Sequence, residues 1–212
     1  MIIYGASPSP FVRKTMAYCT EKGLEVDVQP VGIGDPNPAF REASPFGKMP
    51  GFRDGDFTIS DSTAIITYLE AKFPTPPMLP AEPRSRARTV WYEEFADTIL
   101  IGCMGKMFFN RIVSPRFLGR EGDLALADQA EKEELPPLFD YLESVIPASG
   151  FLVDDRLTLA DLAVASPFVN LGHMNIRPDA AKHPKMAAYV AAILARPSFA
   201  PIVAQEKALF GS

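Results

Sequence analysis

A run of prolines divides this chain, because the pattern of apolar residues before it differs from the pattern after it. Prolines stand at positions 74, 76, 77, 80 and 83. Proline has a fixed φ angle and no amide hydrogen, so neither a helix nor a central strand continues through such a segment. We therefore expect a stiff linker at about residues 74–83, with one domain over residues 1–77 and another over residues 84–212.

The first domain is predicted to mix strands and helices. Strands are expected at residues 1–4, 24–30, 51–53 and 57–60, and helices at 10–22, 39–43 and 61–73. Gly23 ends the first helix pattern, and Asp54-Gly55 is a dipeptide typical of a β-hairpin turn. The opening is thus a βαβ unit, and the fold class expected for this half is α/β.

The second domain is predicted to be all-helical, since no strand pattern occurs after the linker. Helices are expected at about residues 84–112, 123–145, 158–173, 184–195 and 198–208. Thr158 and Asp161 have the spacing of a capping box, and Leu157 and Leu162 have that of a hydrophobic staple. We interpret these four residues as structural. A helical bundle is the architecture that such a set of helices favours.

The composition limits the classes of function. A net charge of −5 without a basic run argues against a nucleic-acid partner, and the Arg84, Arg86 and Arg88 cluster is interpreted as a solvated helix face. The distant Cys19 and Cys103 suggest neither a disulfide nor a metal site. No segment approaches the roughly 18 apolar residues of a membrane span. We expect a cytoplasmic protein without a metal.

The segment from Ser7 to Lys14 joins the first strand to the first helix. Ser9 occupies the N-cap position and Pro10 the first helical position, where each residue type is favoured. These residues alone favour a capping role for Ser9. The alternative is a hydroxyl placed beside the positive end of the helix dipole, where an anion binds well.

Two further segments allow both a structural and a binding interpretation. Gly47-Lys48-Met49-Pro50-Gly51 is either a simple turn or a loop whose Met49 backbone pairs with an extended ligand, with Lys48 near a ligand carboxylate. Ser60-Asp61-Ser62-Thr63 starts a helix and has an ordinary capping explanation. Its exposed amides and the Ser62 hydroxyl would also accept a carboxylate, while Asp61 would hold an ammonium group.

Taken in order along the chain, these motifs resemble the cytosolic glutathione transferase superfamily. The resemblance rests on Ser9-Pro10-Phe11, on residues 45–50, on Asp61-Ser62 and on residues 158–161. The nearest subgroup is that of the bacterial serine-type enzymes, which are similar to the tau class around Ser-Pro-Phe. The resemblance implies a thioredoxin-like N-terminal domain, a helical C-terminal domain and a homodimer.

The resemblance also implies site residues. Glutathione, as a co-substrate, would contact Phe11, Lys48, Met49, a cis-Pro50, Asp61 and Ser62. Ser9 would activate its thiol, with Ser7 as the alternative. The family commonly has Glu where this chain has the shorter Asp61, and the Ser-Ser-Cys signature of the zeta class is absent. No cysteine lies between Ser7 and Phe11, which argues against thiol chemistry by the protein itself.

A second, hydrophobic substrate is expected between the domains, against the long helix after the linker. The candidate residues on this helix are Met104, Met107, Phe108 and Arg111, although such a helical stripe also suits a core. The leading hypothesis is an enzyme whose bound glutathione attacks an electrophile or a peroxide. A non-catalytic interaction module and a glutathione-dependent isomerase or dehalogenase are the alternatives.

Overall fold

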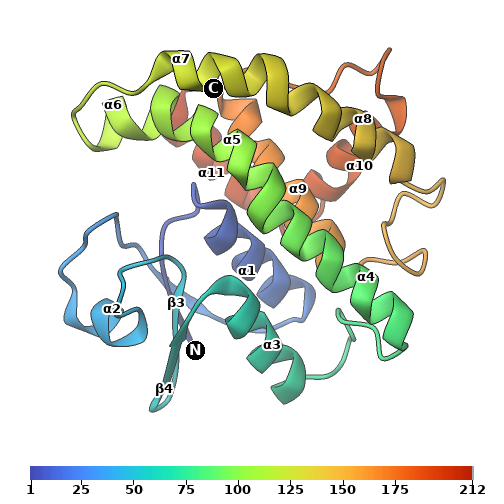
Figure 1. The fold of residues 1–212 in the computed structure, drawn as a ribbon. Helices are drawn as coiled ribbons and strands as arrows, with labels where there is room; N and C mark the ends of the chain where they lie inside the picture. The colour runs from blue at the N-terminus through green and yellow to red at the C-terminus, as the bar shows by residue number, and fades with distance from the viewer. Residues whose placement is uncertain (212) are drawn as a thin grey trace.

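The computed structural model of this protein describes residues 1–211 and contains a sheet-bearing first part and a helical second part (Figure 1). The elements of the first part are β1 (Ile2–Tyr4), α1 (Pro10–Glu21), β2 (Asp27–Gln29), α2 (Pro38–Ala43), β3 (Gly51–Asp54), β4 (Phe57–Ser60) and α3 (Ser62–Lys72). Each element expected from the sequence is present in this half. The change to helices alone occurs between the end of α3 and the start of α4 at Pro83.

The first part is built on a four-stranded sheet with the strand order β2-β1-β3-β4. Strand β1 runs parallel to β2 and antiparallel to β3, with Ile3 opposite Val28 on one side and Phe52 on the other. The β3–β4 hairpin turns at Gly55, whose φ angle of +63° lies in the left-handed region. Because β1 and β3 are antiparallel, the C-terminal end of β1 lies beside the N-terminal end of β3, and the Ser9 and Met49 loops at these ends line one cavity with the helical part.

Strand β2 is shorter than the 24–30 segment expected from the sequence. Gly23 ends α1 in the left-handed conformation, with a φ angle of +67°. The amide of Leu24 then donates to the carbonyl of Cys19 at 2.9 Å, so it closes the helix instead of pairing with a strand. Leu24 therefore belongs to the end of the helix, and the strand begins later, at Asp27.

The second part consists of two long helical rods and three further helices. The first rod comprises α4 (Pro83–Glu94), η1 (Phe95–Leu100), α5 (Ile101–Phe108), η2 (Phe109–Val113) and α6 (Ser114–Phe117), and the second comprises α7 (Leu124–Gln129), η3 (Ala130–Glu134) and α8 (Leu135–Val145). The η segments are π-helical turns within the rods. The remaining helices are α9 (Leu159–His173), α10 (Pro184–Leu194) and α11 (Ala200–Phe210).

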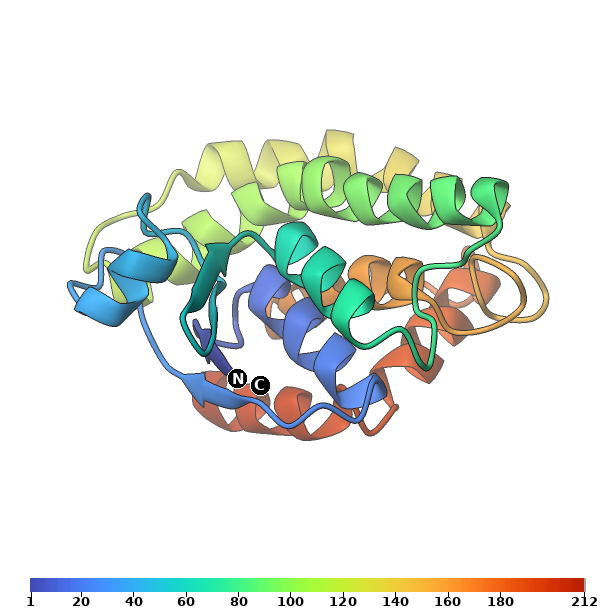
Figure 2. The same cartoon turned by 90° about the horizontal axis from the view of Figure 1, so that it is seen from below.

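Helix α9 is the centre of the molecule. Every residue of α9 except Gly172 is buried, and its most extensive contacts are with α1 and α4. Figure 2 shows α9 beside α1, with α11 below and the first rod above. One hydrophobic cluster runs through both parts, from Ile3 and Phe52 of the sheet to Leu162 of α9. The two parts therefore share a core.

Two other expectations can be compared with the structure. Within residues 1–211, no helix combines the length and the apolar character needed to span a membrane. Cys19 and Cys103 are both buried and neither forms a disulfide. Burial raises the pKa of the Cys19 thiol to about 12.

The expected capping box at the start of α9 is present. The Asp161 carboxylate accepts hydrogen bonds from the amides of Thr158 and Leu152, both at 2.9 Å, and the Tyr189 hydroxyl lies at 3.3 Å. Asp161 has no exposed surface. A single side chain thus satisfies two buried amides, one at the helix start and one in the preceding loop.

We predict that Asp161→Ala lowers the free energy of unfolding by about 3 kcal/mol or more, because it leaves two buried amides without a partner. The control is Asp123→Ala, which removes a surface N-cap bond to Leu126 and should cost about 1 kcal/mol. Urea unfolding followed by circular dichroism measures both. Equal losses in the two variants would contradict this role of Asp161.

Candidate functional site

A cavity of about 520 Å³ lies between the sheet-bearing part and the helical part. The first part contributes Ser9, Phe11 and Met49, and the helical part contributes Met104 and Phe108 of α5. The other residues that line it are Ala6, Pro8, Pro10, Val31, Gly32, Ile33, Ile101, Gly105, Phe109, Val113, Phe117, Leu118, Pro167 and Asn170. The cavity is predominantly apolar, and none of its lining residues is charged.

Ser9 is at the N-cap position of α1, but its side chain makes no capping hydrogen bond. Its amide donates to the Ala6 carbonyl at 3.0 Å, and its carbonyl accepts from the Arg13 amide at 3.0 Å. The capping role that the residues alone favour is therefore wrong. The hydroxyl has no hydrogen-bond partner among the described residues, and it lies at the wall of the cavity beside a helix N-terminus.

Ser7, the alternative to Ser9, has a different environment. It is not among the residues that line the cavity. Burial by itself raises the pKa of Glu206, but the bond with His173, the charge of Arg13 and the Ser7 hydroxyl together lower it below its usual value. Ser7 thus acts on this buried carboxylate and does not line the cavity.

The loop before β3 presents free backbone groups. The Met49–Pro50 peptide bond is cis. The Ser44 hydroxyl donates to the Lys48 carbonyl at 2.7 Å and fixes the turn. Neither the amide nor the carbonyl of Met49 bonds to another residue within 1–211, and the exposed Lys48 side chain has no partner there. This loop can therefore accept a ligand through its backbone.

The start of α3 combines a cap with an unusual backbone conformation. One oxygen of Asp61 accepts hydrogen bonds from the amides of Thr63 at 2.9 Å and Ala64 at 3.1 Å. Asp61 has a φ angle of +83°, in the left-handed region that non-glycine residues seldom adopt. Its amide donates to the Pro50 carbonyl at 3.3 Å, which ties this turn to the Met49 loop. Ser62 follows directly and is almost fully buried.

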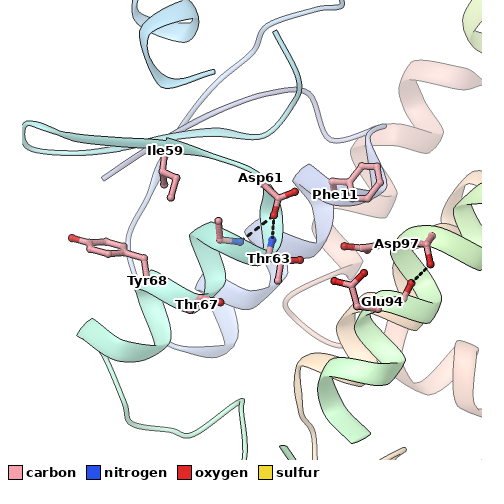
Figure 3. A pocket seen from close by; sticks show the side chains of 10 residues that line it. Phe11, Ile59, Asp61, Thr63, Thr67, Tyr68, Glu94 and Asp97 are labelled. Carbon is pink, nitrogen blue, oxygen red and sulfur yellow. Dashed lines mark hydrogen bonds between the residues drawn. The ribbon is translucent and has the colours of Figure 1, made fainter. Parts of the chain in front are cut away.

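An open cleft of about 780 Å³ lies beside Asp61, and we call it the acidic cleft (Figure 3). Its lining consists of Phe11, Ile59, Asp61, Thr63, Ala64, Thr67, Tyr68, Glu94, Asp97 and Thr98. Burial raises the pKa of Asp97 to about 6, although Lys14 acts in the opposite direction. Figure 3 shows Glu94 and Asp97 on the helical part facing Asp61 and Thr63. Phe11 lines both hollows, so the cavity and the acidic cleft meet at this side chain.

The structure separates the residues expected to contact a second substrate into two pairs. Met104 and Phe108 are four residues apart on one helix face and line the cavity. Met107 has no exposed surface and belongs to the core. Arg111 forms ion pairs with Asp128 at 2.7 Å and Glu131 at 2.5 Å. Neither Met107 nor Arg111 reaches the cavity, so only the first pair is retained as candidates.

Sequence reasoning missed several residues of this region. The cavity wall extends past the end of α5 to Phe109, Val113 and Phe117. It also includes Asn170 of α9, which is 160 residues after Pro10 in the sequence. Periodicity identifies an apolar helix face but not its neighbour in space, so this part of the wall had no local signal. Within residues 1–211, no cluster of His, Cys, Asp and Glu is arranged to hold a metal ion.

The fold and the site can now be compared with known proteins. Family models of the glutathione S-transferase N-terminal and C-terminal domains match residues 3–77 and 111–205, respectively. A glutathione S-transferase from Hyoscyamus muticus is 30% identical over 96% of this chain and 97% of its own length. A stringent starvation protein A homolog from Coxiella burnetii is 28% identical over 94% of this chain and 89% of its own length.

Solved structures agree with these matches. The structure of a glutathione S-transferase from Methylobacterium radiotolerans, in complex with glutathione sulfonate, has a TM-score of 0.77. It is 26% identical and covers 95% of this chain and 93% of its own. The first part is thus a thioredoxin-like domain, followed by an all-helical domain as predicted. The chain belongs to the glutathione S-transferase family.

Proposed function

We propose that this protein is a glutathione transferase in which the Ser9 hydroxyl stabilises the thiolate of bound glutathione. The observation that carries the proposal is the Ser9 side chain, which has no hydrogen bond to another described residue and lies at the wall of an apolar cavity. The thiolate then attacks a hydrophobic electrophile or a peroxide held between Ser9 and α5. With an electrophile, a carbon–sulfur bond forms and the leaving group departs with the bonding electrons. With a hydroperoxide, the sulfur takes up the terminal oxygen, the O–O bond breaks and an alcohol leaves, and a second glutathione thiol then displaces water from the sulfenic acid to form glutathione disulfide.

The rest of glutathione would extend from the cavity across Phe11 to the acidic cleft. The cysteinyl backbone would pair with the amide and carbonyl of Met49, beside the cis-Pro50. The γ-glutamyl carboxylate would lie at Ser62 and the start of α3, where helix amides favour an anion. The second oxygen of Asp61 would hold the ammonium group, and Lys48 a ligand carboxylate.

Simple magnitudes show that one hydroxyl is sufficient for activation. A thiol with a pKa near 8.5 is only about 3% ionised at pH 7. A hydrogen bond to a charged group is worth roughly 1.5 to 3 kcal/mol, or about one to two pKa units. The N-terminus of α1 adds roughly 0.3 to 1 kcal/mol. Together they raise the ionised fraction of the bound thiol at pH 7 from about 3% to roughly 40% or more.

A role for Ser9 as a nucleophile requires a base, and none of the described residues that line the cavity is His, Asp, Glu or Lys. His173 is bonded to Glu206 at 2.9 Å, and His183 to Asp140 at 2.8 Å. Neither histidine lines the cavity. We therefore assign to Ser9 the donation of a hydrogen bond to sulfur, and no covalent chemistry.

A second candidate function is a non-catalytic interaction module. The similarity to the stringent starvation protein A homolog supports it, because that relative does not carry a transferase name. Retention on immobilised glutathione and turnover with a panel of electrophiles and hydroperoxides distinguish the two functions. The same panel, with added isomerase and dehalogenase substrates, separates the reaction classes.

We further propose that this glutathione transferase belongs to the serine-type subgroup that resembles the tau class, and that it acts in the cytoplasm.

We predict that Ser9→Ala still binds glutathione but raises the pKa of the bound thiol by about one to two units and slows conjugation about 10-fold or more. Titration of the thiolate by ultraviolet absorbance measures the pKa. The free energy of unfolding should change by less than about 0.5 kcal/mol, whereas Asn37→Ala, which removes a real cap of α2, should cost about 1 kcal/mol.

The matched control for this prediction is Ser7→Ala, because Ser7 is two residues away and does not line the cavity. It should leave the thiol pKa unchanged. A raised thiol pKa in Ser7→Ala, together with an unchanged one in Ser9→Ala, would transfer the proposed role to Ser7.

For Ser62→Ala we expect a higher KM for glutathione and a nearly unchanged kcat, because Ser62 would contact the end of glutathione remote from sulfur. Losing a hydrogen bond to a charged group weakens affinity about 10-fold to 150-fold. Steady-state kinetics with varied glutathione separates the two parameters. An unaltered KM would show that the γ-glutamyl group does not bind at α3.

We also predict a homodimer in solution. Val90 and Trp91 of α4 and Ile99 of η1 are 40%, 50% and 43% exposed, which is high for apolar side chains on neighbouring turns of one rod. Closed two-fold dimers are the commonest soluble assemblies. Light scattering should give twice the chain mass of 23.2 kDa, and a constant 23.2 kDa at micromolar concentrations would contradict the prediction.

A further inference from the structure

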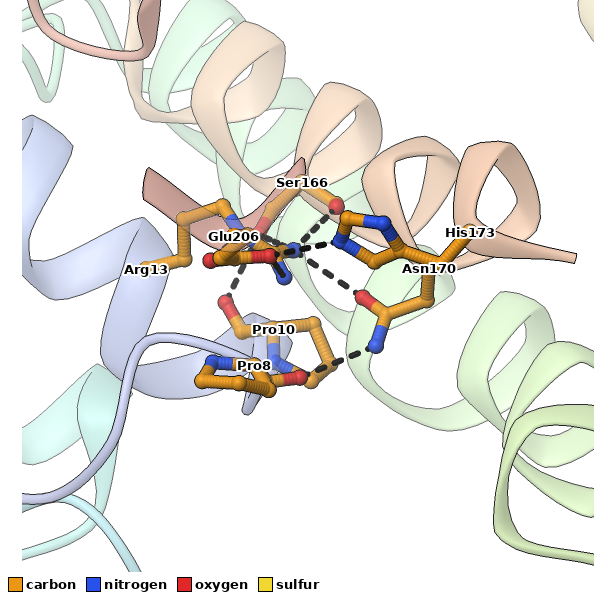
Figure 4. A network of polar contacts seen from close by, with 7 residues as sticks. All are labelled: Pro8, Pro10, Arg13, Ser166, Asn170, His173 and Glu206. Atoms are coloured by element: carbon orange, nitrogen blue, oxygen red, sulfur yellow. Dashed lines mark hydrogen bonds and ion pairs between the residues drawn. The ribbon is translucent and has the colours of Figure 1, made fainter. Parts of the chain in front are cut away.

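The backbone on both sides of Ser9 is held by side chains of α9 (Figure 4). The Asn170 side-chain amide donates to the Pro8 carbonyl at 2.9 Å. The Ser166 hydroxyl donates to the Pro10 carbonyl at 2.8 Å. The two carbonyls that flank Ser9 are therefore both fixed from the helical domain, 156 and 162 residues away in sequence.

These two side chains are in turn held by one buried cation. Arg13 has no exposed surface, and its Nη1 atom donates to Asn170 Oδ1 at 3.0 Å and to Ser166, at 2.7 Å to the carbonyl and 3.4 Å to the hydroxyl. Its Nε and Nη2 atoms donate to the two oxygens of Glu206 at 2.9 and 2.7 Å. Glu206 lies on α11 and is 1% exposed. The bidentate pair gives the guanidinium one orientation.

We propose that Asn170 and Ser166 are positioning residues for Ser9, and that the Arg13–Glu206 pair holds them in place. This inference rests on the proposed role of Ser9 in activating glutathione. The Ser9 side chain has no bond of its own to a described residue, so the position of this turn sets where its Cβ lies and how far its hydroxyl can reach. Because a hydrogen bond weakens steeply with distance and angle, a small shift of this turn reduces stabilisation of the thiolate.

Asn170 also lines the cavity, and its side chain is held from two directions. Its amide donates to the Pro8 carbonyl, and its oxygen accepts from Arg13. Ser166 donates to the Pro10 carbonyl and has 1% of its surface exposed, so it has no contact with a ligand in the cavity. For Ser166, the route to the bound thiol is therefore the turn that carries Ser9.

Two variants test the inference. Ser166→Ala removes the bond to the Pro10 carbonyl. Asn170→Asp is nearly the same size, still accepts from Arg13 and loses the donor to Pro8. The control is Ser198→Ala, which removes a 2.6 Å bond from another buried hydroxyl, to Glu21, away from the cavity. All three variants should be somewhat less stable than the parent protein.

The readout is the pKa of the bound glutathione thiol, together with the pH profile of kcat/KM. Ser166→Ala and Asn170→Asp should raise the pKa by about half to one unit, and below the pKa each unit lowers the thiolate fraction about 10-fold. Their activities should approach that of the parent protein at high pH, where the thiol ionises without help. Ser198→Ala should keep the parent's pKa and pH profile despite its lower stability.

Combination with Ser9→Ala separates this inference from the proposed function. In the Ser9→Ala background, Ser166→Ala should not shift the thiol pKa further, whereas Asn170→Asp should keep the part of its shift that comes from the new carboxylate at the cavity wall. A shift by Ser166→Ala that persists there, or an unchanged pKa in Ser166→Ala while Ser9→Ala shifts it, would overturn the positioning role alone. An unchanged pKa in Ser9→Ala itself would overturn both. Should Asn170→Asp fail to fold, Ser166→Ala decides the outcome.

Discussion

The guanidinium of Arg13 lies where α1, α9 and α11 meet, in a position with no contact with solvent. Removing one partner of a buried ion pair typically costs about 3 to 5 kcal/mol, because the other charge is left buried and uncompensated. Arg13 therefore requires Glu206 from the far end of the chain. The thioredoxin-like domain and the last helix consequently share one electrostatic contact, and the Ser9 turn lies directly beside it.

Two other cations of α1 are buried in the same manner and point to other parts of the molecule. Lys14 pairs with Glu93 and Asp97 of the first helical rod, at 2.9 and 2.5 Å. Lys22, at the C-terminal end of α1, pairs with Glu70 of α3 at 2.6 Å and donates to the carbonyls of Phe73, at the end of α3, and Pro76 of the linker. Apolar packing has little directional preference, whereas each ion pair needs one partner in one place. We infer that these pairs fix how α1 is oriented between the domains.

The same arrangement explains why the two hollows of the candidate site differ in chemistry. The cavity at Ser9 is bounded by apolar side chains of α5 and excludes charge, which strengthens a hydrogen bond to a thiolate. The acidic cleft contains the carboxylates of Asp61, Glu94 and Asp97 and suits a cationic group. Phe11 stands between them. A peptide with a thiol at its centre and an ammonium group at one end matches this order.

Local chemistry made much of the fold predictable. Gly23, Asp54-Gly55 and the capping box at Thr158 act within a few residues, and the structure has each feature where the sequence indicates it. The Arg13–Glu206 pair spans 193 residues and has no local signal, so it could not be found. The capping role that local residues favour for Ser9 is wrong for a related reason. Cap preferences describe a position in the chain, whereas the rotation of one hydroxyl depends on its surroundings in space.

The α5 helix shows the same limit at the site. Spacing alone placed Met104, Met107, Phe108 and Arg111 on one stripe, and it could not show which edge of the stripe faces the other domain. The partners of Arg111, Asp128 and Glu131, come from the second helical rod and draw it away from the cavity. Tertiary packing therefore determines which of these four residues lies in the core, which forms surface ion pairs and which line the cavity.

The most direct test of this account is a pH titration of glutathione bound to the unmodified protein, followed by the ultraviolet absorbance of its thiolate. The account predicts a pKa of about 6 to 7.5, one to two units or more below the value near 8.5 of a free thiol. A bound thiol that titrates at or above 8.5 would contradict it, since Ser9 would then give the sulfur no stabilisation.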